Sequence, residues 1–96
     1  MNIGSAIQTI RKAKGISQLE LSEKIEISQA ALSQIENGLK RPGTKTLDKI
    51  CLILETPKSL LYVLSIGDED VPESRKLMYE KLFPEIKKSI MTIVQG

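Results

Sequence analysis

The residues with the most distinctive chemistry lie between Ser28 and Ile35, where small and amide side chains follow one another. The outward helical positions of this stretch carry no charge and no large apolar side chain, and they are Gln29, Ala30, Ala31, Ser33 and Gln34. Glutamine can form two hydrogen bonds with the edge of adenine, and alanine can contact the methyl group of thymine. The same face could also be an ordinary solvated helix surface. The elements around it must decide between these interpretations.

The chain has few residues that are suited to catalysis or to metal binding. It contains no histidine and one cysteine, which removes the usual metal sites and the Cys/His and Ser/His nucleophile arrangements. The cysteine, Cys51, lies on an apolar helical stripe with Leu47, Ile50 and Leu54, where we expect it to act as a small core residue. No glycine-rich phosphate loop is present. We therefore expect a protein that is not an enzyme and that holds neither a metal nor a cofactor.

Two short helices joined by a tight turn should present the polar face. Ser17 is a good N-cap, and Glu20 three residues later completes the pattern of a capping box. The second helix begins after Ser28 and ends at Asn37-Gly38, where glycine readily adopts the left-handed conformation. A helix of about nine residues does not persist alone in water. Packing must therefore hold it, which leaves its polar face free.

Three further helices are expected in the first two thirds of the chain. They span residues 3–13, Thr44 to Thr56, and Pro57 to about Ile66. Arg11, Lys12 and Lys14 lie near the end of the first of these helices, where they could either favour the helix dipole or bind phosphate. Residues 39–43 form a basic loop with a proline and a glycine, and Thr44 then caps the next helix.

The chain divides into a unit of residues 1–66 and an extension of residues 67–96. Apolar residues keep a helical period through the extension, and they are Tyr79, Leu82, Phe83, Ile86, Ile90, Ile93 and Val94. Pro84 interrupts the hydrogen bonds of a helix, so either two helices, about 72–82 and 84–94, or one helix kinked at the proline should form. A stripe this long must pack on the domain, on a second subunit or on another protein.

The charge of the chain is nearly balanced. Fourteen basic and twelve acidic residues leave a net charge of +2, which is too weak to indicate nucleic acid by itself. The basic excess lies in residues 1–66, with nine basic and six acidic residues. One cysteine and the absence of a signal-peptide pattern indicate a cytoplasmic protein. The longest apolar runs are too short for a membrane span.

With these elements the chain resembles the Cro and phage-repressor type of helix-turn-helix domain, the XRE family. The residues that carry the resemblance are Gln18, Leu21, Ile25, Ile27, Leu32, Ile35, Glu36, Asn37 and Gly38. It covers about residues 3–66 and implies an all-α fold, a five-helix lambda-repressor-like DNA-binding domain, here with a C-terminal helical extension. In such domains the second helix of the unit lies in the major groove. The resemblance therefore implies that residues 28–36 form the recognition helix.

The resemblance also implies which residues contact double-stranded DNA. Its base-facing positions are Gln29, Ala30, Ser33 and Gln34. Its backbone-contacting positions are Gln18, Ser28, Asn37, Lys40, Arg41, Thr44 and Lys45. In the family the glutamine at Gln18 binds a phosphate and supports the first side chain of the recognition helix, here Gln29, and Arg41 could also reach a minor groove. Arg11 and Glu36 match a pair that forms a buried salt bridge in some relatives, for which we expect a structural role.

Two positions depart from the family pattern. Glu26 stands where glycine is common in the turn between the two helices, and a glutamate in a left-handed turn would cost on the order of 1 kcal/mol. Ser22 stands where alanine is common, and serine is small enough to keep the close approach of the helices.

These features predict a sequence-specific transcriptional regulator, and we expect a repressor because a small domain that covers an operator needs no further activity. Two good base contacts discriminate by only about 2–6 kcal/mol, the low end of what a specific site requires. We therefore expect a homodimer on a near-palindromic operator, with half-sites about one helical turn apart, and a nucleoid location when bound to DNA.

The dimer contact is expected from the fifth helix and the extension. The candidate residues are Leu60, Leu61, Leu64, Phe83, Ile86 and Ile90. They could instead complete the core of the monomer. The alternative function is an antitoxin or adaptor whose C-terminal helices bind a partner protein and whose DNA binding is autoregulatory.

Overall fold

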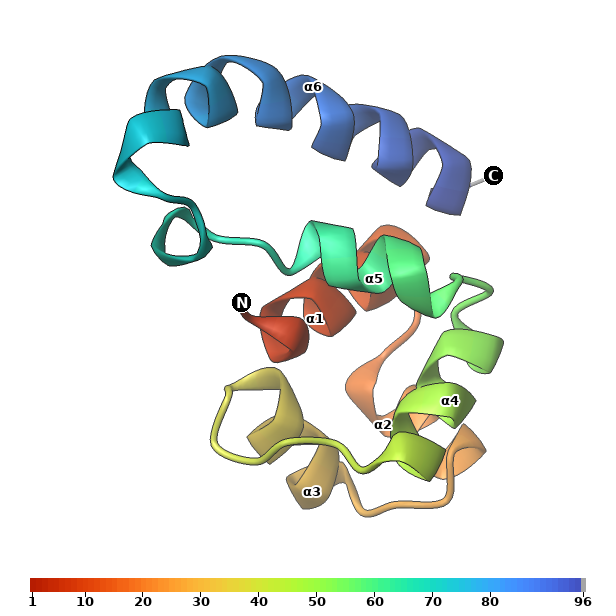
Figure 1. Cartoon of the computed structure of the whole chain (residues 1–96). Coiled ribbons are helices and arrows are strands. Elements are labelled where there is room, and N and C mark those ends of the chain that lie inside the picture. The colour runs from red at the N-terminus through yellow and green to blue at the C-terminus, as the bar shows by residue number, and fades with distance from the viewer. Residues whose placement is uncertain (96) are drawn as a thin grey trace.

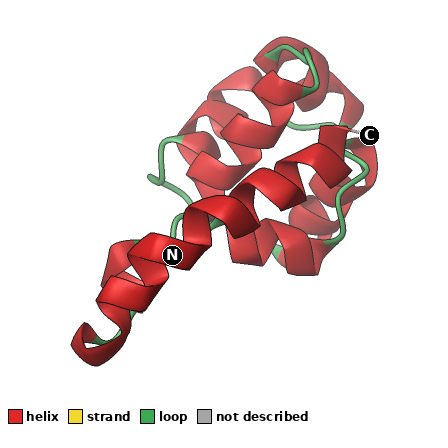
Figure 2. Cartoon of the chain, turned by 90° about the horizontal axis from the view of Figure 1, so that it is seen from above, coloured by secondary structure: helices red, strands yellow, loops and turns green. Residues whose placement is uncertain are grey.

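The structure is a computed structural model, and it describes residues 1–95. Figure 1 shows five short helices and a long C-terminal helix. In chain order they are α1 (Ile3–Ala13), α2 (Gln18–Lys24), α3 (Gln29–Glu36), α4 (Thr44–Ile53), α5 (Lys58–Leu64), the 3-10 turns η1 (Asp68–Asp70) and η2 (Glu73–Arg75), and α6 (Lys76–Gln95). Figure 2 shows only helices and loops, and no strand occurs in residues 1–95. The expected all-α fold is confirmed.

Serine caps begin α2 and α3 where the sequence predicts them. The Oγ atoms of Ser17 and Ser28 each accept a hydrogen bond of 3.0 Å from the backbone N–H three residues later. The capping box at Ser17 is only half formed. The Glu20 carboxylate lies 3.4 Å from the Lys24 ammonium instead of returning to the backbone of Ser17.

The predicted cap of α4 is wrong by one residue. Gly43 occupies the N-cap position and offers no side-chain hydrogen bond, so Thr44 is the first residue of the helix. The turns on either side of α3 follow the expected backbone conformations. Glu26 has φ +62° in the turn before α3, and Gly38 has φ +77° after it. Glutamate therefore adopts the left-handed conformation that glycine supplies in the family pattern, and it does so at an energetic cost.

The core is built around α1, which lies between α3 on one side and α5 and α6 on the other (Figure 1). Ile7 and Ile10 of α1 are completely buried in a core to which each of the other five helices contributes residues. Gly4 permits the close approach of α1 and α3, because a Cβ atom there would stand 2.0 Å from the Ile35 carbonyl oxygen. This contact holds α3 from behind and leaves its opposite face open.

The C-terminal extension folds back onto the rest of the chain. α6 continues on both sides of Pro84, so one helix forms and the two-helix alternative does not. Ile90 and Val94 join the core of the domain. Phe83 is also buried and stacks on Tyr79 with ring centroids 4.7 Å apart. The expected first turn at Pro72 is a 3-10 turn, and the α-helix itself begins at Lys76.

Candidate nucleic-acid interface

The exposed face of α3 carries the uncharged side chains that the sequence singled out. Gln29, Ala30 and Gln34 are exposed, and Ser33 is half-buried. Leu32 and Ile35 point into the core, so the face has no competing apolar residue. The four predicted base-facing residues therefore share one accessible surface of the same helix.

A buried ion pair fixes α3 against α1. Arg11 Nε donates to Glu36 Oε2 at 2.7 Å, and Arg11 Nη2 donates to Glu36 Oε1 at 2.9 Å. The third donor, Arg11 Nη1, bonds the Ile16 carbonyl oxygen at 2.9 Å. The side chains are 8% and 0% exposed, so the guanidinium and the carboxylate satisfy one another away from water. Of the two roles open to Arg11, the geometry favours the structural one over phosphate binding.

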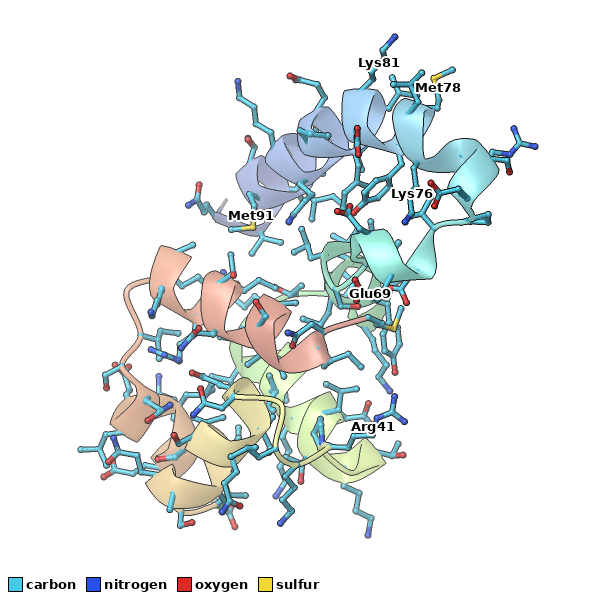
Figure 3. All side chains as sticks on the ribbon, turned by 90° about the vertical axis from the view of Figure 1, so that its left-hand side faces the viewer. Arg41, Glu69, Lys76, Met78, Lys81 and Met91 are labelled. Atoms are coloured by element: carbon cyan, nitrogen blue, oxygen red, sulfur yellow. The ribbon has the colours of Figure 1, made fainter. Side chains whose placement is uncertain are left out.

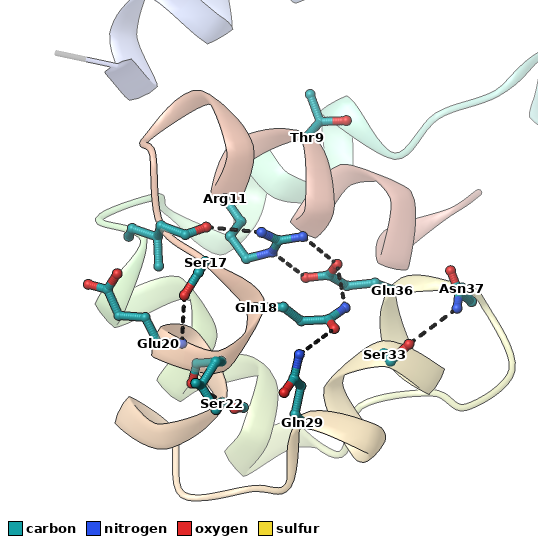
Figure 4. Close-up of polar contacts among 12 residues, drawn as sticks. Thr9, Arg11, Ser17, Gln18, Glu20, Ser22, Gln29, Ser33, Glu36 and Asn37 are labelled. Carbon is teal, nitrogen blue, oxygen red and sulfur yellow. Dashed lines mark hydrogen bonds and ion pairs between the residues drawn. The ribbon is translucent and has the colours of Figure 1, made fainter.

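The ion pair extends through two glutamines to the surface of α3. Figure 4 shows the chain of contacts from Arg11 to Glu36, Gln18 and Gln29. Gln18 Nε2 donates to Glu36 Oε1 at 3.2 Å, and Gln29 Nε2 donates to Gln18 Oε1 at 3.5 Å. A carboxylate only accepts hydrogen bonds, so Glu36 turns the amide nitrogen of Gln18 inward and its oxygen outward. Gln29 then keeps its own Oε1 and one N–H free.

Side chains capable of binding phosphate lie at both ends of α3 and in the segment that follows it. Ser28, Asn37, Lys40, Arg41, Thr44 and Lys45 are all exposed. Within residues 1–95, Lys40, Arg41 and Lys45 take part in none of the ion pairs. The loop that carries Lys40 is held against α3, because its N–H donates to the Gln34 carbonyl oxygen at 3.2 Å. The basic loop thus lies next to the reading face with its charges available.

One neighbour of the basic loop was not foreseen from the sequence. A cleft of about 350 Å³ lies between the loop, the start of α1 and α5, and Lys58 lines it together with Lys40 and Arg41. Lys58 also forms an ion pair with Asp48 of α4 at 2.5 Å. Seventeen residues separate Lys58 from Arg41, and no local pattern in the sequence indicates that they meet.

The predicted dimer residues have different surroundings in the structure. Leu61, Leu64 and Ile90 are buried in the core of their own chain, as in the alternative that the sequence left open. Leu60 is half-buried against that core, and Phe83 is covered within the chain, whereas Ile86 is 47% exposed. Of the predicted set, Ile86 offers the most surface for a contact with another molecule.

Three further features bear on the exclusions drawn from the sequence. Cys51 is half-buried beside the core, and burial raises the pKa of its thiol. In the described part of the chain, His, Cys, Asp and Glu nowhere gather as three or more in a way that could hold a metal ion. None of the helices in residues 1–95 is both long enough and apolar enough to cross a membrane.

The chain is similar to known helix-turn-helix proteins. The helix-turn-helix family profile matches residues 7–61. The chain is 34% identical over 64 residues to the ImmF control region 10 kDa protein of Bacillus phage phi105, and the aligned residues cover 67% of this chain and 71% of that protein. It is 36% identical over 60 residues to an uncharacterized HTH-type transcriptional regulator of Mycobacterium tuberculosis, covering 62% and 43% of the two chains. Antitoxin PezA of Streptococcus pneumoniae is 39% identical over 49 residues, covering 51% and 31%. The matched segment spans less than half of the last two proteins, and the family match ends before α6.

Proposed function

Because the chain belongs to the Cro/C1-type (XRE) helix-turn-helix family of DNA-binding transcriptional regulators, we propose that it is a repressor that binds a near-palindromic operator as a homodimer. In this proposal residues 1–66 read DNA and residues 67–96 serve assembly. The observation that carries the proposal is the reading face of α3, whose first glutamine is held by Gln18 and through it by the buried ion pair. The Gln29 side chain is thus held in position for contact with a base before DNA binds.

The reading itself is assigned to Gln29, Ala30, Ser33 and Gln34. The free Oε1 of Gln29 can accept from adenine N6, and its remaining N–H can donate to adenine N7. Each such bidentate contact discriminates by about 1–3 kcal/mol. Amide and methyl groups without cations favour A·T pairs over G·C pairs, whose guanine is usually read by arginine or lysine.

Affinity is assigned to the groups around α3. Arg41, Lys40 and Lys45 are unpaired within the described residues and exposed, and the other predicted phosphate contacts are Gln18, Ser28, Asn37 and Thr44. Each phosphate that a cation neutralises contributes about 0.9 to the slope of log affinity against log salt. Binding should therefore be strongly salt-dependent, although the net charge of the chain is only +2.

A homodimer is proposed because one reading face is too small for a specific site. Two base contacts supply about 2–6 kcal/mol, whereas specific binding typically exceeds non-specific binding by about 4–10 kcal/mol. A two-fold dimer doubles the contacts and requires half-sites whose centres lie about 10–10.5 base pairs apart.

Selection of bound sequences from random DNA, followed by gel-shift titration, tests the function. Wild-type protein should return an inverted repeat. Gln29→Ala should weaken the selected site about tenfold while leaving non-specific binding intact. Arg41→Ala should weaken all sequences and reduce the salt slope by about 1. Gln95→Ala is the matched control, since that glutamine is exposed and belongs to α6, which lies at the other end of the molecule from α3 (Figure 1). Absence of any preferred sequence would refute the proposal.

A second candidate is an antitoxin or adaptor with autoregulatory DNA binding. The similarity to antitoxin PezA and the exposed apolar side chains on α6 favour it. Its test is purification of the chain after co-expression with the gene next to its own. A stoichiometric complex that Ile86→Glu disrupts would support this candidate, and a chain that purifies alone while selecting an operator would exclude it.

A further inference from the structure

The cleft beside the basic loop has the size of a site for a small molecule. Its volume of about 350 Å³ falls within the range of about 300–1,000 Å³ that such sites have. The lining includes Ile35 and Leu47, which belong to the core, but none of the four residues assigned to base reading. A duplex on the exposed face of α3 can therefore reach the rim of the cleft, at Lys40 and Arg41, and leaves its depth open to a second molecule.

Hydrogen bonds tie the walls of the cleft to their neighbours. At the start of α1, the Asn2 N–H donates to the carbonyl oxygen of Ser65, the C-cap of α5, at 2.7 Å. The basic loop is tied to α3, because the N–H groups of Leu39 and Lys40 both donate to the Gln34 carbonyl oxygen, at 2.9 and 3.2 Å. The cleft is thus part of the folded chain before a ligand binds, which lowers the cost of binding.

Cations line the cleft. Lys40, Arg41 and Lys58 lie in its lining, and none of the aspartates or glutamates in residues 1–95 does. The carboxylates that pair with lining groups lie outside the cleft, and they are Asp48, Glu69 and Asp70. Arginine forms paired hydrogen bonds with phosphate oxygens, and lysine adds a point charge. The cleft therefore suits a phosphate monoester, which carries a charge of about −1.5 to −2 at neutral pH.

An aromatic ring stands beside these cations. Tyr62 of α5 lines the same cleft and is 37% exposed. It follows Lys58 by one helical turn, so a cation and a ring share one face of α5. Arg41 is exposed, and Figure 3 shows it at the edge of the molecule where Glu69 also lies, so a molecule can reach the cleft from solvent. Heterocycles stack on tyrosine rings. A planar ring joined to a phosphate monoester therefore matches both kinds of group.

We propose that this cleft binds a small molecule in which a phosphate monoester carries a planar heterocycle, as in a nucleoside monophosphate, and that the bound molecule competes with DNA. Lys40, Arg41 and Lys58 hold the phosphate, and the heterocycle lies against Tyr62. The competition rests on the proposed function, in which Lys40 and Arg41 bind DNA phosphates. A side chain drawn to the ligand is no longer available to the DNA backbone, so an occupied cleft weakens operator binding.

Isothermal titration calorimetry of the full chain at fixed ionic strength tests the site, with adenosine monophosphate as the probe. Ribose phosphate is the matched comparison because it carries the phosphate monoester without the heterocycle, and adenosine carries the heterocycle without the phosphate. Adenosine monophosphate should bind at least about tenfold more tightly than either compound. If it binds no more tightly than ribose phosphate, or does not bind, the proposal is overturned.

Substitutions in α5 and α4 locate the binding. Lys58→Gln should weaken adenosine monophosphate about tenfold, and Tyr62→Ala should reduce its affinity to that of ribose phosphate, whereas Tyr62→Phe keeps the ring and should bind normally. Asp48→Asn should strengthen binding about threefold, because it frees the Lys58 ammonium from its ion pair. Lys88→Gln is the matched control, since Lys88 is exposed on α6 and does not line the cleft. Wild-type affinity in both Lys58→Gln and Tyr62→Ala would overturn the proposed site.

Gel shifts with the selected operator, again at fixed ionic strength, test the competition. Adenosine monophosphate should release the wild-type chain from the operator, and ribose phosphate at the same concentration should release less of it. No DNA contact is assigned to Lys58, so Lys58→Gln should bind the operator normally and stay bound at concentrations that release the wild type. A wild-type complex that survives saturating adenosine monophosphate, or equal release of both proteins, would overturn the competition.

The two sets of measurements keep this inference separate from the proposed function. A chain that binds adenosine monophosphate through Lys58 and Tyr62 but selects no DNA sequence would overturn the proposed function and leave the cleft site intact. A chain that selects an operator but does not distinguish adenosine monophosphate from ribose phosphate would overturn the cleft site and leave the DNA-reading role intact.

Discussion

Replacement of Arg11 by methionine tests the link between the core and the reading face. Methionine keeps the aliphatic bulk of the side chain but removes the bonds of 2.7 and 2.9 Å to Glu36 and the bond to the Ile16 carbonyl oxygen. The Glu36 side chain is 0% exposed, so its charge cannot be solvated without local opening. Loss of one partner from such a pair costs about 3–5 kcal/mol, a large share of the roughly 5–15 kcal/mol that stabilises a domain.

The loss is measurable as a thermal shift. In a domain of 60–100 residues, 1 kcal/mol lowers the melting temperature by about 4–8 °C, so Arg11→Met should lower it by at least about 12 °C. Urea unfolding followed by circular dichroism gives the same difference in free energy. Lys24→Met is the control, because it removes the exposed Lys24–Glu20 pair at 3.4 Å and should cost less than about 1 kcal/mol.

The double variant Arg11→Met/Glu36→Leu separates stability from recognition. Replacement of both charges by apolar groups should recover most of the lost stability. It also removes the acceptor that orients the Gln18 amide, so Gln18 can rotate and no longer presents its oxygen to Gln29. The folded double variant should therefore discriminate less between the operator and a site altered at the Gln29 position. A single variant that loses under about 1 kcal/mol, or a double variant with wild-type discrimination, would refute this reasoning.

Two further predictions concern the backbone that places α3. Gly4→Ala should lower the free energy of unfolding, measured in urea, by about 1–3 kcal/mol, because the new Cβ would meet the Ile35 carbonyl oxygen. Gly43→Ala is the comparison, because a Cβ atom there has open space around it. Equal urea midpoints for wild type and Gly4→Ala would show that α1 and α3 can move apart without a loss of stability. Glu26→Gly should raise the melting temperature slightly, because the left-handed φ of +62° costs a non-glycine residue about 1 kcal/mol or more and the added freedom of glycine in the unfolded chain offsets only part of this. A lower melting temperature would show that the Glu26 side chain itself stabilises the turn.

The sequence predicted the elements whose signals are local. Ser17 and Ser28 begin helices, and Gly38 follows one in the left-handed conformation, because caps and turns depend on a few neighbouring residues. The packing partners of exposed or amphipathic segments depend on the whole fold and were harder to assign. Leu61 and Leu64 match both a dimer contact and a core, and only the arrangement of α1, α5 and α6 shows that they lie in the core.

The candidate site follows the same distinction. The resemblance to a known family suggested the pair Arg11 and Glu36 and the support of Gln29 by Gln18, and the structure brings all four together. The position of Lys58 beside the basic loop depends on the packing of α5 against α4. No periodicity within either segment carries that information. The roles of these residues toward DNA remain predictions.

The arrangement separates the energetic tasks of a DNA-reading protein among different surfaces. α3 has no cation between Ser28 and Ile35, so a substitution there should change the preferred base and leave the salt dependence unchanged. Lys40, Arg41 and Lys45 lie outside that face, so their removal should change the salt slope and leave the preferred sequence unchanged. The extension, to which assembly is assigned in the proposed function, ends in α6 at the far end of the molecule from α3 (Figure 1), so a substitution that disrupts assembly there should change only the gain from a second half-site. If one surface carried base reading, phosphate binding and assembly together, a single substitution would change the preferred base, the salt slope and the gain from a second half-site at once.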